Sequence, residues 1–176
     1  MKKMNVLELF AGGGGFRVGL ERANKEFFET KWANQWEPSR KRQDAFECYN
    51  NHFPDSLNFN CDISSLDEDF FSRLQIEGVD MITAGFPCQD YSVASTTGLG
   101  ITGKKGVLFW DLARIIRLTK PKCFLLENVD RILKSPSKQR GRDFSIILST
   151  LNQLGYTVEW RVLNSAEYGF PQRRIR

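Results

Sequence analysis

The stretch Asn5-Val6-Leu7-Glu8-Leu9-Phe10-Ala11-Gly12-Gly13-Gly14-Gly15 decides how the fold of this chain is interpreted. A short apolar run ends in four glycines, and apolar residues then recur at helical spacing over residues 16–23. A strand, a glycine turn and a helix in this order are typical of the opening of a nucleotide-binding α/β unit. Glycines in such a turn allow the backbone to approach a ligand closely, beside the N–H groups of a helix start.

The glycine turn does not match the common phosphate-binding patterns. No Gly-Lys-Ser/Thr follows it, and its glycines are not spaced as G-x-G-x-x-G. The turn by itself therefore leaves the kind of ligand open.

Strands and helices alternate along the rest of the chain. Apolar runs predict strands at residues 31–35, 57–60, 79–84, 123–126 and 156–163, and helical spacing predicts helices at 39–51, 66–74, 107–119 and 144–154. The helix at 39–51 is expected to start at Glu37-Pro38, because proline is favoured in a first helical turn. This alternation predicts an α/β fold, with a mostly parallel sheet, right-handed crossovers and helices on both faces, in a single domain of residues 1–176.

The composition is that of an ordinary globular domain. Of the 176 residues, 41% are hydrophobic and 26% are charged, which suits one domain with its own core. His52 is the only histidine and the four cysteines form no CxxC pair, which argues against a zinc site and a Cys–His catalytic pair. No secretory leader and no apolar run of membrane-spanning length is present, so we expect a cytoplasmic protein without a membrane partner.

Most of the excess positive charge lies in one part of the chain. Residues 104–142 contain eleven lysines and arginines against three acidic residues, while the whole chain has a net charge of only +4. Such a segment suits contact with a phosphate backbone, although lysines are common on any solvated helix.

A second turn, Gly85-Phe86-Pro87-Cys88-Gln89, follows the predicted strand at 79–84. Open α/β sheets place ligands and reactive groups at such strand ends, so this turn can present Cys88 to a cleft. A free cysteine is also often a buried and inert residue, and position alone leaves both interpretations open. Residues 91–106 are rich in Gly, Ser and Thr, which predicts a long functional loop.

Polar residues also follow the second and third predicted strands. Gln35-Trp36-Glu37 offers a stacking face and hydrogen-bond acceptors for a base and a ribose, or else a core aromatic and a helix-start carboxylate. Asp62-Ile63 offers an acceptor for an exocyclic amine beside an apolar residue, or else a simple N-cap.

Two later segments contain charged residues that could belong to a functional site. Glu127-Asn128 directly follows the strand at 123–126, and its carboxylate can hydrogen-bond a ring nitrogen or simply be solvated in a loop. Gln172-Arg173-Arg174-Ile175-Arg176 is a basic segment, which taken alone is usually a solvated tail.

Taken together, these segments resemble the motifs of the cytosine-C5 DNA methyltransferase family, in order and in spacing. Phe10-Ala11-Gly12-Gly13-Gly14-Gly15 resembles its first motif, Gly85-Phe86-Pro87-Cys88-Gln89 its catalytic motif, Glu127-Asn128-Val129 its sixth and Gln172-Arg173-Arg174-Ile175-Arg176 its eighth. The resemblance runs from Asn5 to Arg176. It implies a Rossmann-like fold that uses S-adenosylmethionine.

The resemblance implies methylation of carbon 5 of a cytosine that is flipped out of double-stranded DNA. Cys88 would add to carbon 6 of the ring, and the resulting enamine would attack the methyl group of S-adenosylmethionine. Glu127 would hydrogen-bond or protonate N3, Arg176 would hold the O2 edge, and Arg174 would support Glu127. A base then removes the C5 proton, elimination frees Cys88, and the loop at 91–106 would cover the base. The implied catalytic set is Cys88, Glu127, Arg174, Arg176, Pro87 and Asn128.

The resemblance also implies a pocket for S-adenosylmethionine and no metal. Phe10 and Trp36 would pack on the adenine faces, Asp62 and Ile63 would read its edge, and the glycine backbone would meet the methionine end. The implied cofactor-binding set is Phe10, Ala11, Gly12, Gly13, Gly14, Gly15, Gln35, Trp36, Glu37, Asp62, Ile63 and Pro87.

Two positions depart from the family pattern. The family usually has Glu where Gln35 stands, and that Glu holds the ribose hydroxyls, so here either Gln35 or Glu37 would do so. Lys105-Gly106 stands where Arg-Gly is more usual, a change that should keep a phosphate contact.

Family members continue past the eighth motif into a target-recognition region and two further motifs. We therefore expect a C-terminally truncated domain, which is either a fragment or one subunit of a split enzyme with a complementary partner. The leading interpretation is the catalytic portion of a DNA methyltransferase from a restriction–modification or solitary system. The alternatives are cytosine methylation in tRNA and an inactive chain that only binds S-adenosylmethionine or a partner.

Overall fold

A computed structural model describes residues 2–87, 107–135 and 139–176 of the chain. The chain divides into two compact units. The first unit comprises Met1–Phe86 and Arg114–Leu126, and the second comprises Pro87–Ala113 and Glu127–Arg176.

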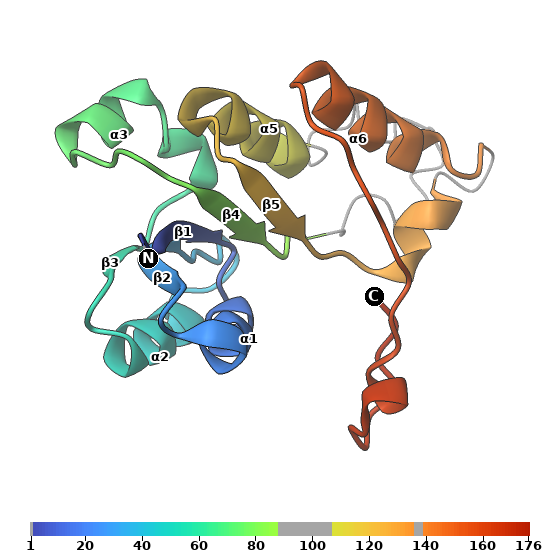
Figure 1. Cartoon of the computed structure of the whole chain (residues 1–176), viewed down its shortest axis with the longest axis horizontal. Coiled ribbons are helices and arrows are strands. Elements are labelled where there is room, and N and C mark those ends of the chain that lie inside the picture. The colour runs from blue at the N-terminus through green and yellow to red at the C-terminus, as the bar shows by residue number, and fades with distance from the viewer. Residues whose placement is uncertain (1, 88–106, 136–138) are drawn as a thin grey trace. The chain divides into compact units, whose positions relative to one another are not determined.

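The first unit contains a five-stranded parallel sheet in the order β3-β2-β1-β4-β5 (Figure 1). The strands are β1 (Met4–Leu9), β2 (Phe28–Asn34), β3 (Leu57–Phe59), β4 (Met81–Ala84) and β5 (Cys123–Leu126). The predicted parallel sheet is thus confirmed. Strand order reverses between β1 and β4, and in α/β sheets the crevice at such a switch point, outside the carboxyl ends of the strands, is where ligands bind.

Helices cover both faces of this sheet, as predicted (Figure 1). Helices α1 (Gly15–Asn24) and α2 (Asp44–His52) lie on one face, and α3 (Glu68–Arg73) lies on the other with the end of α5 (Val107–Thr119). The Arg114 guanidinium donates to the carbonyls of Leu66 and Ile63 at 2.7 and 3.0 Å. This side chain therefore ties α5 to the short helix η1 (Ile63–Ser65) and the turn before α3.

The second unit contains η3 (Asp130–Lys134), α6 (Arg142–Gln153) and η4 (Ser165–Tyr168). The strand predicted at 156–163 is wrong, because this segment belongs to no strand in the described ranges. At its end, Leu163 bonds Arg176 beside an Asn164–Ile175 antiparallel bridge. Trp160 and Val162 are 57% and 43% exposed. An alternating pattern becomes a strand only where neighbouring strands pair with it, and none here does.

The start of α2 also differs from its prediction. The helix begins at Asp44 instead of near Glu37, because the Gln43 side chain closes a turn over the intervening residues. Gln43 Oε1 accepts from the Glu37 N–H at 2.8 Å, and Gln43 Nε2 donates to the Glu37 and Arg40 carbonyls. Helix α3 likewise begins late, at Glu68, since Asp67 caps it by accepting from Phe70 N at 2.8 Å.

None of the helices in the described ranges is both long enough and apolar enough to cross a bilayer.

Candidate functional site

The glycine turn leaves β1 with its backbone fixed against β2. Phe10 has φ +54°, an uncommon left-handed conformation for a residue with a side chain, and such strain tends to occur at functional sites. The Ala11 N–H donates to the Asn34 carbonyl at 3.0 Å, and the Gly12 N–H donates to Gln35 Oε1 at 2.8 Å. The end of β2 therefore holds the turn in place.

The two sides of the turn differ in the space around them. Gly14 has φ +88°, and a Cβ there would lie 2.4 Å from the Phe53 ring, so the turn rests on α2 and only glycine fits. A Cβ on Gly12, Gly13 or Gly15 would meet no described atom within 4 Å. The turn is therefore open to a ligand on that side.

The residues that follow β2 differ in whether their side chains are already hydrogen-bonded within the protein. Gln35 is 9% exposed, with its Oε1 bonded to the turn and its carbonyl accepting from Asn60 Nδ2 at 2.7 Å. Trp36 and Glu37 are half-buried. The Glu37 backbone is held by Gln43, whereas its carboxylate makes no hydrogen bond or ion pair within the described structure. Of the two candidates for a ribose, Glu37 is the one with a free acceptor.

At the end of β3, Asp62 is an N-cap. Its Oδ1 accepts from Ser64 N at 2.8 Å at the start of η1, and Ile63 is only 3% exposed. Asn34, which the sequence analysis did not single out, connects this turn to β2 by donating from Nδ2 to the Cys61 carbonyl at 2.9 Å. The only signal for Asn34 in the sequence was its place as the last residue of the strand, directly after Trp32 and Ala33.

The turn after β4 is described only as far as Pro87. Phe86 is buried and Pro87 is exposed. Cys88, the predicted nucleophile, lies outside the described residues, as do Gln89, Lys105 and the predicted loop at 91–106.

In the second unit, a carboxylate meets two arginines. Glu127 Oε1 makes an ion pair with Arg176 Nε, and Arg174 Nη2 lies 3.9 Å from the same oxygen. Their side chains are 33%, 26% and 52% exposed for Glu127, Arg176 and Arg174 respectively. The sixth and eighth motifs are thus brought together, with Arg176 closer to Glu127 than Arg174 is.

A backbone hairpin places these arginines. Leu163 and Arg176 exchange two N–H···O bonds of 2.8 Å, and the Ser165 N–H donates to the Arg174 carbonyl at 3.0 Å. Arg174 and Arg176 are two residues apart in an extended segment, so they project to one side. Asn128 lies between Glu127 and η3, where its Oδ1 accepts from Val129 N at 2.8 Å.

Within the described ranges, no group of three or more His, Cys, Asp or Glu side chains is placed to hold a metal ion.

A five-stranded parallel sheet with an open glycine turn at its switch point is a Rossmann-like fold. Two solved structures share it and show the fold alone. A putative DNA modification methyltransferase from an Escherichia coli prophage has a TM-score of 0.71 and 24% identity, over 98% of this chain and 44% of its own. The Entamoeba histolytica methyltransferase EhMeth has a TM-score of 0.73 and 20% identity, over 99% and 51%.

Comparison with protein families identifies the chain more narrowly than its fold does. The model of the C-5 cytosine-specific DNA methylases matches residues 4–176, and this chain belongs to that family. Similar proteins include the type II methyltransferases M.Sau3AI of Staphylococcus aureus, 58% identical over the whole chain and 42% of the relative, and M.NlaIV of Neisseria lactamica, 36% identical over the whole chain and 40% of the relative. M.HhaI of Haemophilus parahaemolyticus is 34% identical over 98% of the chain and 47% of the relative. The chain spans less than half the length of these relatives.

Proposed function

We propose that this chain supplies the cofactor pocket and the base-activating carboxylate of a type II DNA cytosine-C5 methyltransferase. The observation that carries the proposal is the convergence of Arg174 and Arg176 on Glu127, because these residues are 47 or more positions apart and a solvated tail has no reason to fold back onto one carboxylate. The family description names DNA, which favours DNA over tRNA as substrate.

The first unit has the features that S-adenosylmethionine requires. The open side of the glycine turn would meet the methionine end, Phe10 and Trp36 would contact the adenine, and Asp62 would accept from its amine. Glu37, which keeps an unbonded carboxylate in the described structure, would hold the ribose hydroxyls, since Gln35 Oε1 is already bonded to Gly12. S-adenosylmethionine, when bound, supplies an electrophilic methyl group.

The other residues would activate the cytosine. The Cys88 thiolate would add to carbon 6 while the protonated Glu127 carboxyl group donates its proton to N3, and the resulting enamine would attack the methyl group from carbon 5. A base would then remove the C5 proton, and elimination would free the Cys88 thiolate. The ion pair with Arg176 would orient the Glu127 carboxylate and leave the arginine near the O2 edge of the base. Basic residues of the 104–142 segment would contact the phosphate backbone of double-stranded DNA.

We propose that the remaining length found in the relatives comes from a continuing chain or a complementary subunit that carries the target-recognition region. Methyl transfer to unmethylated DNA is then expected to be weak for residues 1–176 alone and to rise when that second portion is added. If the portion were added and DNA gained no methyl groups, the chain would be an inactive binding protein instead.

The central test is a covalent trap. A duplex with 5-fluorocytosine in the target site, incubated with the completed protein and S-adenosylmethionine, is expected to form a complex that survives denaturing electrophoresis, because fluorine cannot leave as a proton. Cys88→Ser should abolish it, and Cys48→Ser, at an exposed cysteine of α2, should not. Trapping by Cys88→Ser would show that another residue is the nucleophile.

A further inference from the structure

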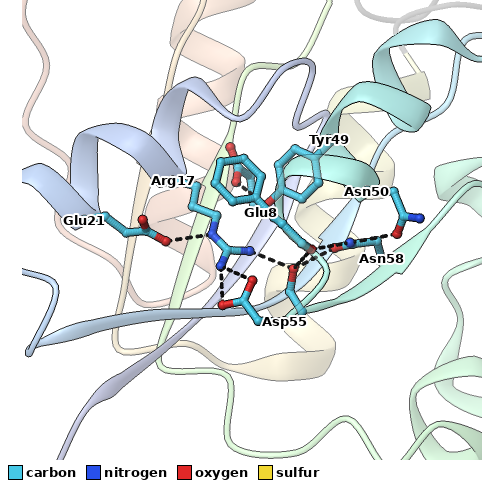
Figure 2. Close-up of polar contacts among 9 residues, drawn as sticks. Glu8, Arg17, Glu21, Tyr49, Asn50, Asp55 and Asn58 are labelled. Atoms are coloured by element: carbon cyan, nitrogen blue, oxygen red, sulfur yellow. Dashed lines mark hydrogen bonds and ion pairs between the residues drawn. The ribbon is translucent and has the colours of Figure 1, made fainter.

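Glu8, Tyr49 and Arg17 form a polar cluster, whose contacts Figure 2 shows. Glu8 of β1 and Tyr49 of α2 are 0% and 1% exposed, and Tyr49 Oη donates a 2.9 Å hydrogen bond to Glu8 Oε2. Glu8 Oε1 forms no hydrogen bond of good geometry in the part of the chain that the structure describes, although the backbone N–H groups of Phe16 and Arg17 lie close enough to lower the pKa of the carboxylate. Burying a carboxylate this completely is unfavourable for stability, which suggests that Glu8 is present for another purpose.

Tyr49 supports the turn directly. Its ring belongs to one buried cluster with Ala11, Ala33 and Phe53, and a Cβ on Gly14 would lie 3.3 Å from it. The Gly14 N–H donates to the Ala11 carbonyl, and the Val18 N–H donates to the Gly14 carbonyl, each at 2.9 Å. The position of the Tyr49 ring therefore determines how the turn connects β1 to α1.

Arg17 joins the cluster from the first turns of α1. It is 3% exposed, and its guanidinium reaches Glu21 at 2.8 Å, Asp55 at 2.7 Å and Ser56 Oγ at 2.7 Å (Figure 2). The guanidinium also lies 4.2 Å from the centre of the Phe53 ring. Helix α1 is thereby fixed to the segment after α2, so the turn is held from β1, α1 and α2 at once.

The charge on Glu8 responds to these same groups. The pKa of Glu8 is raised to about 7. Burial is the largest cause and raises it, while the Tyr49 hydrogen bond, the N–H groups of Arg17 and Phe16 and the Arg17 charge offset part of that rise. Tyr49 and Arg17 are the titratable groups that face Glu8 from α2 and α1, and Arg17 shares its charge with Glu21 and Asp55. The strand neighbours in register with Glu8, Ala33 on β2 and Thr83 on β4, carry no charge. The ionised form attracts Tyr49 and the first turn of α1 more strongly than the neutral form.

We propose that Glu8 and Tyr49 are positioning residues whose buried hydrogen bond holds the glycine turn in the shape that binds S-adenosylmethionine. The proposal rests on the proposed function, because it needs the turn to be the cofactor site. Neither residue contacts the cofactor. Both act through the turn backbone.

The first test is cofactor affinity, measured by titration calorimetry with S-adenosylmethionine. Tyr49→Phe keeps the ring and removes only the hydroxyl, and we expect roughly three- to tenfold weaker binding, since part of the lost bond is passed to the turn. Ser135→Ala is the matched control. Ser135 Oγ donates a 2.6 Å bond to the buried Asp143 in the second unit, and its removal should leave cofactor affinity unchanged.

The second test is the pH dependence of that affinity between about pH 5.5 and 8.5, around the pKa of the buried carboxylate. Binding by the wild type should strengthen as pH rises through about 7, where Glu8 ionises. Glu8→Gln should lose this rise and keep only the titration of the cofactor's own α-amino group. Tyr49→Phe should move the rise to higher pH, because the Tyr49 bond lowers the pKa of Glu8. A merely structural role would not move this midpoint.

The outcomes separate the two claims. Wild-type protein that bound no S-adenosylmethionine would overturn the proposed cofactor site and the positioning role with it. Wild type that bound it, with Tyr49→Phe matching its affinity and pH midpoint, would overturn the positioning role alone. If Glu8→Gln did not fold, the shift of the Tyr49→Phe midpoint would still decide.

Discussion

The glycine turn is held together differently from the hairpin that brings Arg174 and Arg176 to Glu127. At the turn, backbone N–H groups are held by the Asn34 carbonyl and by the Gln35 side chain, and these residues are 2% and 9% exposed. At the hairpin, side chains that are between a quarter and a half exposed are paired by charge. A buried hydrogen-bonded turn is shaped before its ligand arrives, whereas exposed ion pairs are weak and rearrange easily. The first arrangement suits tight binding of a constant cofactor, and the second suits a carboxylate that must engage a base.

The largest effect is expected at the hairpin. Glu127→Gln in the completed protein should lower the rate of methyl transfer about 100-fold or more, because a positioned acid is lost, while the melting temperature stays within a degree or two of wild type. Arg176→Ala should also lower the rate of methyl transfer. Arg173→Ala is the control, since this exposed neighbour makes no contact with Glu127 in the described structure. Equal losses for Arg173→Ala and Arg176→Ala would contradict the pairing.

At the turn, the two sides should respond in opposite ways to one added methyl group. Gly14→Ala forces a Cβ to 2.4 Å from Phe53 at a positive φ, and we expect a loss of about 2–4 kcal/mol in the free energy of unfolding. Gly13→Ala meets open space and should not lower stability, yet it should weaken binding of S-adenosylmethionine. Urea unfolding and calorimetry would measure both. Gly13→Ala with normal affinity would mean that the ligand does not approach this side.

The stability of the buried Glu8–Tyr49 pair should depend on pH. Folded protein keeps a proton on Glu8 up to about pH 7, whereas the unfolded chain releases it near 4.5. The folded state thus binds more protons between these values, and the free energy of unfolding should fall as pH rises, by up to roughly 3 kcal/mol. Subtracting the profile of Glu8→Gln isolates this contribution. A difference that is flat from pH 5 to 8 would place the pKa elsewhere.

The smallest effect concerns the ribose. Glu37→Gln should weaken cofactor binding about three- to tenfold, because a charged acceptor is replaced by a neutral one. Glu47→Gln, at an exposed position of α2, serves as the control for lost charge. Were Gln35→Ala to weaken binding while Glu37→Gln did not, the ribose would be held through Gln35 instead.

The backbone of the first unit could be predicted well because its segments are strongly patterned. The strand at 123–126 and the helix at 107–119 match β5 and α5 residue for residue. The hydrogen bond of Gln43 to Glu37 could not be foreseen, since only the folded side chain shows that it closes a turn and delays α2. The strand at 156–163 failed because a strand depends on partners that its own sequence does not specify.

The sequence indicated which residues at the strand ends belong to the candidate site. It indicated less well which of their side chains contact one another. The resemblance led us to expect Arg174 near Glu127, and its Nη2 lies 3.9 Å from Glu127 Oε1, whereas the ion pair of Arg176 with the same oxygen was not expected. The catalytic roles of these three residues stay predictions. The bond between Glu8 and Tyr49 joins residues 41 positions apart. Glu8 stands out as a charge inside an apolar run, but the sequence does not show which residue it meets. The roles of Cys88, Asp62 and Ile63 stay predictions.

The central position of β1 also has a consequence for the order of folding. Its contacts with β2 form within the first 34 residues, whereas on its other side the Asn5 N–H bonds Asp80, 75 residues away. Closing such a long loop is slow, so we expect the β1–β4 pair to form late. The switch point between β1 and β4 would then be completed only in the last stage of folding. The rate at which a refolding sample regains ligand binding would therefore report the rate of that final step.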